Sequence, residues 1–280
     1  MQIIIYTMKK FILLIALFAA AGVAAQGKKA ITILHTNDTH STIDQKDGNP
    51  GAVDRALVIE HVRDSVGAGN MLLFDCGDFS QGSLYYNIHK GAVEVEIMNA
   101  MGYDACAIGN HEFDFGLENM ARIFKMAKFP IVCANYDFTG TPCEGIVKPY
   151  VVIERAGKRI GVFGLSPDFA DLVSDSNSAG VRFVHPAEAA RKAVEALEKE
   201  KCDVIICLSH LGWKDDKAVN SQYNDEYLAA NTAGIDVILG GHSHNYFEKP
   251  VTYTNADGKP VIVQQMGSKG RYIGYVTIAV

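Results

Sequence analysis

Short polar clusters recur along this chain, and each follows an apolar run that is typical of a buried β-strand. The runs read ITIL, MLLFDC, ACAI, VIICL and DVIL, and each is followed within a few residues by aspartate, asparagine or histidine. In open α/β sheets, residues just beyond the carboxyl ends of parallel strands gather at one edge, where ligands bind. The sequence therefore predicts an α/β fold whose chemistry lies at one sheet edge.

The periodicity of apolar residues extends this prediction to the whole chain. Candidate strands are 31–36, 71–75, 104–108, 131–134, 150–154, 159–164, 203–208, 235–239, 260–264 and 272–279. Candidate helices are 53–65, 92–101, 117–127 and 186–200. Their alternation favours βαβ units, whereas the paired runs at 150–164 and after 250 favour antiparallel hairpins. Because no linker-like segment divides residues 26–280, we expect one domain of mixed sheets covered by helices.

The N-terminal segment 1–25 has the pattern of a cleavable export signal. Lys9 and Lys10 precede an apolar run, and small residues ending in Val23-Ala24-Ala25 follow it. The apolar run is too short to span a bilayer. We therefore expect cleavage after Ala25, no stable membrane insertion afterwards, and a periplasmic or secreted protein.

The net charge of −6, without basic clusters, disfavours duplex nucleic acid and anionic membranes as partners. A phosphate group bound by such a chain must meet local positive charge, and metal ions are one source of it. The six cysteines favour buried thiols, because most lie in or beside apolar runs. Cys133 and Cys143 are the pair that position favours if a disulfide forms in an exported protein.

The polar clusters contain side chains that bind divalent metals. Asp38 and His40 are two residues apart at a strand end, so they project to the same side, and His242 and His244 repeat this spacing. The two carboxylate oxygens of Asp78 suit a bridge between two cations. Asn110 and His210 supply a neutral oxygen and an imidazole in the remaining clusters.

Each cluster alone also has a structural interpretation. Asp38 and Asp78 could cap helices or form turns, and a histidine such as His210 at the end of a strand is commonly a core-edge residue. The combination of all these clusters in one chain favours a two-metal hydrolytic site.

The motifs as a set resemble those of a known family. They are LHTNDTHS, DCGDFSQGS, IGNHEFDFG, LSHLG and GIDVILGGHSH. They resemble the metallophosphatase domain of 5′-nucleotidases, within the calcineurin-like phosphoesterases, and the resemblance extends over residues 26–280. It implies an α/β fold of four layers, an α/β/β/α sandwich of two mixed sheets flanked by helices.

The resemblance also implies roles for individual residues. It assigns one metal to Asp38, His40 and His244, a second to Asn110, His210 and His242, and a bridging position to Asp78. It makes His111 and Asp114 the catalytic dyad. These ligands suit Zn, Mn or Fe without distinguishing them.

Chemistry follows from that arrangement. Two divalent ions would lower the pKa of a bridging water enough to form hydroxide near neutral pH. His111 would stabilise the transition state or protonate the leaving oxygen, with Asp114 orienting its imidazole. Asp114 has an alternative role as a cap for the helix near 117, and Glu112 is expected to be structural.

Three functions remain open. The leading one is an exported phosphomonoesterase that hydrolyses nucleoside 5′-monophosphates. A second keeps the metal site but cleaves 2′,3′-cyclic nucleotides or another ester. The third is a non-catalytic exported metal-binding protein, which the presence of both His111 and Asp114 disfavours. The 5′-nucleotidases carry a C-terminal nucleotide-binding domain that this sequence lacks, so the chain either pairs with a separate protein of that kind or works alone.

Overall fold

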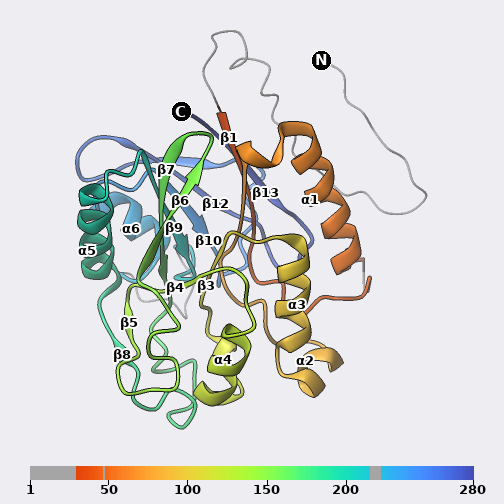
Figure 1. Ribbon diagram of the computed structural model, residues 1–280. Helices are drawn as coiled ribbons and strands as arrows, with labels where there is room; N and C mark the ends of the chain where they lie inside the picture. Colours follow the sequence, from red (N-terminus) through yellow and green to blue (C-terminus); the bar gives the residue numbers. More distant parts are fainter. Residues whose placement is uncertain (1–29, 47, 215–221) are drawn as a thin grey trace.

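The computed structural model describes residues 30–46, 48–214 and 222–280 (Figure 1). The expected signal peptide and its cleavage site lie outside these residues. Residues 215–221 also lie outside the described residues, and they belong to a polar stretch after the candidate strand at 203–208. None of the described helices combines the length and the apolar character needed to cross a bilayer.

The first sheet has five strands in the order β13-β1-β2-β3-β4. Its strands are β1 (Ala30–Thr36), β2 (Met71–Asp75), β3 (Ala105–Ala107), β4 (Ile131–Val132) and β13 (Gly274–Ala279). The pairs from β1 to β4 are parallel, whereas β13 runs antiparallel to β1. The last strand of the chain thus closes the sheet begun by the first described strand.

The second sheet has six strands in the order β11-β12-β10-β9-β7-β6. Its strands are β6 (Tyr150–Arg155), β7 (Lys158–Leu165), β9 (Val204–Ser209), β10 (Val237–Gly240), β11 (Val251–Thr254) and β12 (Pro260–Gln265). The four central strands are parallel. The β6–β7 and β11–β12 pairs are the two antiparallel hairpins that the sequence predicts.

Helices cover the outer face of each sheet (Figure 1). On the first sheet lie α1 (Ala52–Val66), α3 (Ala92–Met101) and α4 (Gly116–Phe124), with the short α2 (Leu84–His89) nearby. On the second sheet lie α5 (Pro186–Lys199) and α6 (Asp225–Asn231). A two-stranded ribbon, β5 (Tyr136–Asp137) with β8 (Arg182–Phe183), completes the described elements together with two 3₁₀ turns, η3 (Ala68–Asn70) and η4 (His111–Phe113).

Three apolar clusters separate these layers. Alternate residues of β2 show how the division arises, because Leu73 packs toward the helices of the first sheet while Leu72 and Phe74 face the second sheet. A third cluster lies between the second sheet and α5 and α6, where Ala190 and Val194 of α5 are buried. The predicted four-layer α/β/β/α sandwich is therefore confirmed.

The predicted strands and helices are present, with small shifts at their ends. Four further elements were not predicted, because they are short and carry little periodic signal: α2, α6, β5 and β8. All six cysteines are free thiols. The pairing of Cys133 with Cys143 is not formed, and each Sγ instead contacts polar groups of other residues, such as Asn135 and the Leu117 carbonyl.

Candidate metal centre

The two sheets deliver the predicted site residues from the carboxyl ends of their parallel strands. Asp38 and His40 follow β1, Asp78 follows β2, and the Asn110–His111 pair follows β3. The second sheet contributes one residue after β9 and two after β10, namely His210, His242 and His244. Side chains distant in sequence thus reach one end of the sandwich, as expected for an α/β fold.

Backbone hydrogen bonds tie the first two of these segments together. The Asp38 amide donates to the Gly77 carbonyl at 3.0 Å, and the His40 amide donates to the Asp78 carbonyl at 3.0 Å. Five predicted ligands have a positive φ: Asp38 (49°), His40 (44°), Asp78 (54°), His242 (74°) and His244 (56°). Such strained backbone persists where the surrounding structure enforces it, and it clusters at functional sites.

The first group of ligand atoms comes from Asp38, His40 and His244, which lie within 4.8 Å of one another. His244 Nε2 lies 3.1 Å from His40 Nε2 and 3.3 Å from Asp38 Oδ1. Asp38 is fully buried, whereas the His244 side chain is 44% exposed. This group therefore opens to solvent on the side of His244.

The second group comes from Asp78, His210 and His242, again within 4.8 Å. His210 Nε2 lies 3.0 Å from Asp78 Oδ2 and 3.8 Å from Asp38 Oδ1. Asp78 also groups with His40 and His111, so its carboxylate lies between the two clusters. The backbone amide of His242 donates to Asp38 Oδ2 at 2.9 Å, which connects the clusters a second time.

Two buried atoms of this second cluster have no hydrogen-bond partner among the described residues: Asn110 Oδ1 and His210 Nε2. His210 donates its Nδ1 proton to the Cys76 carbonyl at 2.6 Å, which leaves the Nε2 lone pair directed elsewhere. Buried polar atoms are normally satisfied. An unpaired amide oxygen and an unpaired imidazole nitrogen beside a carboxylate fit the donor set of a transition-metal cation.

The buried carboxylates of the site also favour a positive charge close to them. Burial alone would raise the pKa of Asp78, but the charge of His210 and its contact with the carboxylate hold that pKa below its usual range. Burial opposes a charge on His210, yet the Asp78 and Asp38 carboxylates raise its pKa to about 10. Two buried carboxylates thus attract either a proton or a metal ion to the same place.

His111 and Asp114 form a pair at the mouth of the site. His111 Nδ1 lies 3.1 Å from Asp114 Oδ2, and both side chains are about one-third exposed, at 32% and 34%. Burial lowers the pKa of His111, but the hydrogen bond to Asp114 and the charge of Asp78 outweigh it, so the pKa is raised. No side chain caps α4, and the Asp114 carboxylate faces His111 instead.

Glu112 supports the centre through backbone groups. Its buried carboxylate accepts hydrogen bonds from the amides of Gly109 at 2.6 Å, Asp78 at 3.0 Å and Ser80 at 3.2 Å. A Cβ at Gly109 would lie 2.2 Å from Asp78 Oδ1, so only glycine allows the two loops to approach this closely. Glu112 is structural, as expected, and it acts on the loop that carries Asp78.

Sequence reasoning missed the residues that hold Asp38 and the neighbouring Gly241 in place. Asn37 donates its side-chain amide to Asp38 Oδ2 at 2.6 Å and to the Gly267 carbonyl at 2.7 Å. Gln265 donates to the Gly241 carbonyl at 2.7 Å. The only signal in the sequence is the position of Asn37 beside a predicted ligand, since Gln265 lies in a distant strand.

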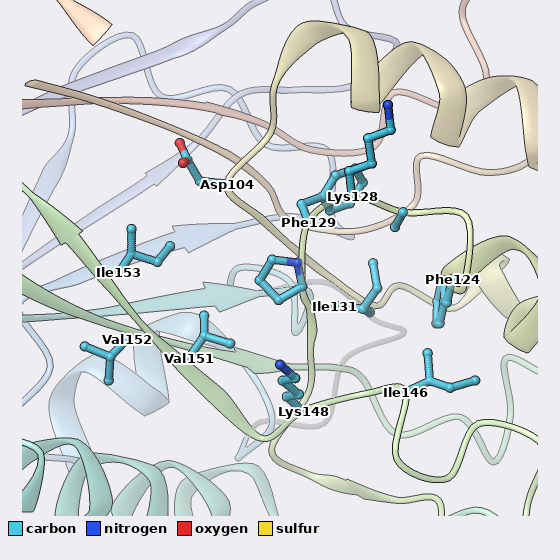
Figure 2. A pocket seen from close by; sticks show the side chains of 12 residues that line it. Asp104, Phe124, Lys128, Phe129, Ile131, Ile146, Lys148, Val151, Val152 and Ile153 are labelled. Carbon is cyan, nitrogen blue, oxygen red and sulfur yellow. The ribbon is translucent and has the colours of Figure 1, made fainter. Parts of the chain in front are cut away.

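A cavity of about 480 Å³ lies elsewhere in the molecule, where Val151 and Ile153 of β6 approach Ile131 of β4 (Figure 2). Lys128 and Lys148 also line it, with Asp104 at the amino end of β3. None of the predicted ligands or dyad residues borders this cavity. The convergent polar groups, and not the cavity, therefore mark the candidate site.

Known proteins resemble this chain over most of its length. The calcineurin-like phosphoesterase family matches residues 31–246, a range that includes every predicted ligand. The human 5′-nucleotidase is 33% identical over 294 residues, covering 95% of this chain and 49% of that protein. The trifunctional nucleotide phosphoesterase protein of Bacillus subtilis (strain 168) is 32% identical over 282 residues, covering 89% of this chain and 18% of that protein.

A solved structure also resembles this chain. The 5′-nucleotidase precursor of Thermus thermophilus superimposes with a TM-score of 0.79 at 32% identity, covering 89% of this chain and 51% of that chain. The chain spans about half the length, or less, of the curated relatives it matches.

Proposed function

The chain belongs to the calcineurin-like phosphoesterase family, and from that premise we propose that it hydrolyses phosphate monoesters with two divalent cations. Nucleoside 5′-monophosphates are the leading substrates, yielding nucleoside and phosphate. The observation that carries the proposal is the convergence of donor atoms on Asp78, with His210 Nε2 3.0 Å from its carboxylate and His40 in the adjoining cluster.

Seven residues would hold the two cations. Asp38, His40 and His244 would bind the first, Asn110, His210 and His242 the second, and Asp78 both. When bound, the cations would supply positive charge for the phosphate dianion and lower the pKa of a coordinated water. Zn, Mn and Fe all suit this donor set.

His111 would act on the leaving group. Its raised pKa keeps a larger fraction of the imidazole protonated near neutral pH, as a general acid requires. Asp114 holds Nδ1 by hydrogen bonding, so the other ring nitrogen is the one available to donate a proton to the leaving oxygen. The His111 amide also donates to Asp78 Oδ1 at 2.9 Å, which links the acid to the bridging carboxylate.

Export and partnership form a second part of the proposal. The pattern of residues 1–25 supports an exported protein, periplasmic or secreted, in which residues 26–280 form the metallophosphatase domain. We propose further that a separate protein resembling the remaining half of these relatives assists this chain, which covers 49% of the human relative and 51% of the Thermus thermophilus one. The chain would then be a catalytic subunit.

The alternative substrate keeps the same residues. The Bacillus subtilis relative is named for trifunctional nucleotide phosphoesterase activity, which favours including a 2′,3′-cyclic nucleotide among the substrates to be tried. Family membership disfavours the third interpretation, a non-catalytic metal-binding protein.

The test is an assay of purified residues 26–280. Protein stripped of metal by a chelator and then supplied with Mn²⁺ or Zn²⁺ should release phosphate from 5′-AMP and from an aryl phosphate. A parallel assay would include a protein resembling the C-terminal half of the relatives. No phosphate release under any of these conditions, with metal bound, would overturn the proposed activity, and rates independent of the added protein would overturn the subunit role.

A further inference from the structure

Two tyrosine rings stack beside the exposed end of the candidate metal centre. The ring centroids of Tyr246 and Tyr272 are 4.0 Å apart, and the ring planes differ by 25°. At this distance the faces of the two rings are in contact with each other. The pair does not belong to any of the apolar clusters that form the core.

Both tyrosines are attached to segments that carry predicted ligands. Tyr246 follows His244 by two residues, a separation of about 7 Å along an extended chain. Tyr272 lies in the loop between β12 and β13, where the Lys269 amide donates to the Asp38 carbonyl at 2.7 Å. The ring pair is therefore fixed relative to both Asp38 and His244.

Hydrogen bonds on both sides of Tyr246 hold its backbone. The Asn245 amide donates to the side chain of Gln265, and the Phe247 amide donates to the Gln265 carbonyl at 2.9 Å. Gly267, whose φ is +67°, lies against the pair, because a Cβ placed there would be 3.6 Å from the Tyr272 ring. This support would pre-organise an aromatic surface before a ligand arrives.

The outer surface of Tyr246 is available. The residue is 37% exposed, although Tyr272 covers one face of its ring. Among the described residues, no second ring or cation is stacked on Tyr246. Phe115, on the His111 side of the mouth, is also 37% exposed, but Lys90 Nζ lies 5.2 Å from its ring centroid and Tyr86 packs on it at 5.2 Å.

We propose that Tyr246, backed by Tyr272, stacks on the base or aryl group of the phosphate ester whose phosphate lies at the metal centre. The identity of the ester rests on the proposed function. Stacking uses the π-face that all bases share, so this surface would favour aromatic phosphate esters over sugar phosphates without selecting one base. This chain would then contribute by itself to the preference for aromatic phosphate esters.

The test compares two substrates that differ only in the base: 5′-AMP and ribose 5-phosphate. With Mn²⁺ present, Tyr246→Ala should raise KM for 5′-AMP roughly 5- to 50-fold and leave kcat nearly unchanged. KM for ribose 5-phosphate should stay within about twofold, because stacking contributes nothing to a sugar phosphate. Equal changes for both substrates, or no change for either, would overturn the proposal.

Matched variants separate stacking from general damage. Tyr246→Phe keeps the ring and should behave as the wild type, whereas Tyr246→Leu keeps an apolar side chain without a ring and should behave as Tyr246→Ala. Tyr85→Ala removes a tyrosine of similar exposure, 39%, from α2 and should leave both KM values unchanged.

A binding measurement distinguishes this proposal from the proposed function. Saturation-transfer NMR with adenosine and metal-free protein should show transfer to the adenine protons that Tyr246→Ala loses. If the wild type hydrolyses neither substrate, the proposed function fails, and the adenosine measurement alone decides the role of the tyrosines. Equal transfer in wild type and Tyr246→Ala overturns that role.

Discussion

His210 Nε2 lies 3.0 Å from Asp78 Oδ2 in a buried pair that joins the two sheets of the sandwich. The imidazole nitrogen has no hydrogen-bond partner among the described residues, although it is so close to a carboxylate. His210 also donates Nδ1 to the Cys76 carbonyl, just before the loop that carries Asp78. The contact therefore places two predicted ligands side by side, and the imidazole nitrogen is the atom of the pair that is left without a hydrogen bond.

Asp78→Asn should lower metal content at both positions. The carboxylate lies between the two groups of ligands, so its loss removes a charge shared by both cations. Elemental analysis after loading with Mn²⁺ should fall from about two ions per chain, the number that a bridging ligand implies, to fewer than one. Asp257→Asn, in an exposed turn, is the matched control and should keep the wild-type stoichiometry. Unchanged metal content in Asp78→Asn would refute the bridging assignment.

His111→Asn should keep its metals and lose rate. General acid catalysis contributes roughly 10²- to 10⁴-fold, so kcat on 5′-AMP should fall by about 10² or more. An aryl phosphate has a leaving group that needs little protonation, and its rate should fall less. Steady-state kinetics on the two substrates measure the difference. Equal losses on both would remove His111 from the role of proton donor.

Asp114→Asn should shift the pH dependence of the reaction. The hydrogen bond and charge of Asp114 raise the pKa of His111, so their loss should lower it. A general acid is active below its pKa, which means that the alkaline limb of the kcat profile should move to lower pH. An alkaline limb that stays in place would show that His111 is not the titrating acid.

Metal-free protein should lose stability as the pH rises. The folded-state pKa of His210 is about 10, above its ordinary value of 6.5, so protonation favours folding. This contribution is complete below about pH 6.5 and is lost as the pH rises toward about 10. The difference in unfolding free energy between the wild type and His210→Asn, measured by urea denaturation in chelator, should therefore shrink across this range. A constant difference would contradict the raised pKa.

Glu112→Gln should destabilise the protein even though Glu112 touches no predicted ligand atom directly. Its carboxylate accepts three backbone amides, and an amide side chain would place an NH₂ group against some of these donors. We expect a loss of about 1–3 kcal/mol in the free energy of unfolding, measured by urea denaturation. The control is Glu118→Gln, because Glu118 is exposed on α4. Equal stability of the two variants would be inconsistent with this role.

Much of the fold and of the candidate site follows from local sequence pattern. Continuous apolar runs such as those of β2 and β9 predict buried parallel strands, and predicted ligands follow both strands within a few residues. The short elements α2 and β5 could not be predicted, because they contain too few residues to show a periodic pattern of apolar side chains. Local pattern also cannot show that β13 pairs with β1, since that register depends on contacts across the whole chain.

The same limit applies to the residues around the site. Asn37 links its neighbour Asp38 to the distant Gly267 carbonyl, and Gln265 donates to the Gly241 carbonyl, 24 residues away in sequence. The stacking of Tyr246 on Tyr272 likewise depends on how two loops fold over Gly267. The candidate ligands could be proposed from their motifs, whereas the residues that hold them in place became visible only in the three-dimensional structure.

The most direct test of the metal centre is anomalous diffraction from crystals of Mn²⁺-loaded protein. Two peaks should appear, one contacted by Asp38, His40 and His244 and the other by Asn110, His210 and His242, with the Asp78 carboxylate between them. A single peak, or peaks bound by other residues, would contradict the two-metal centre.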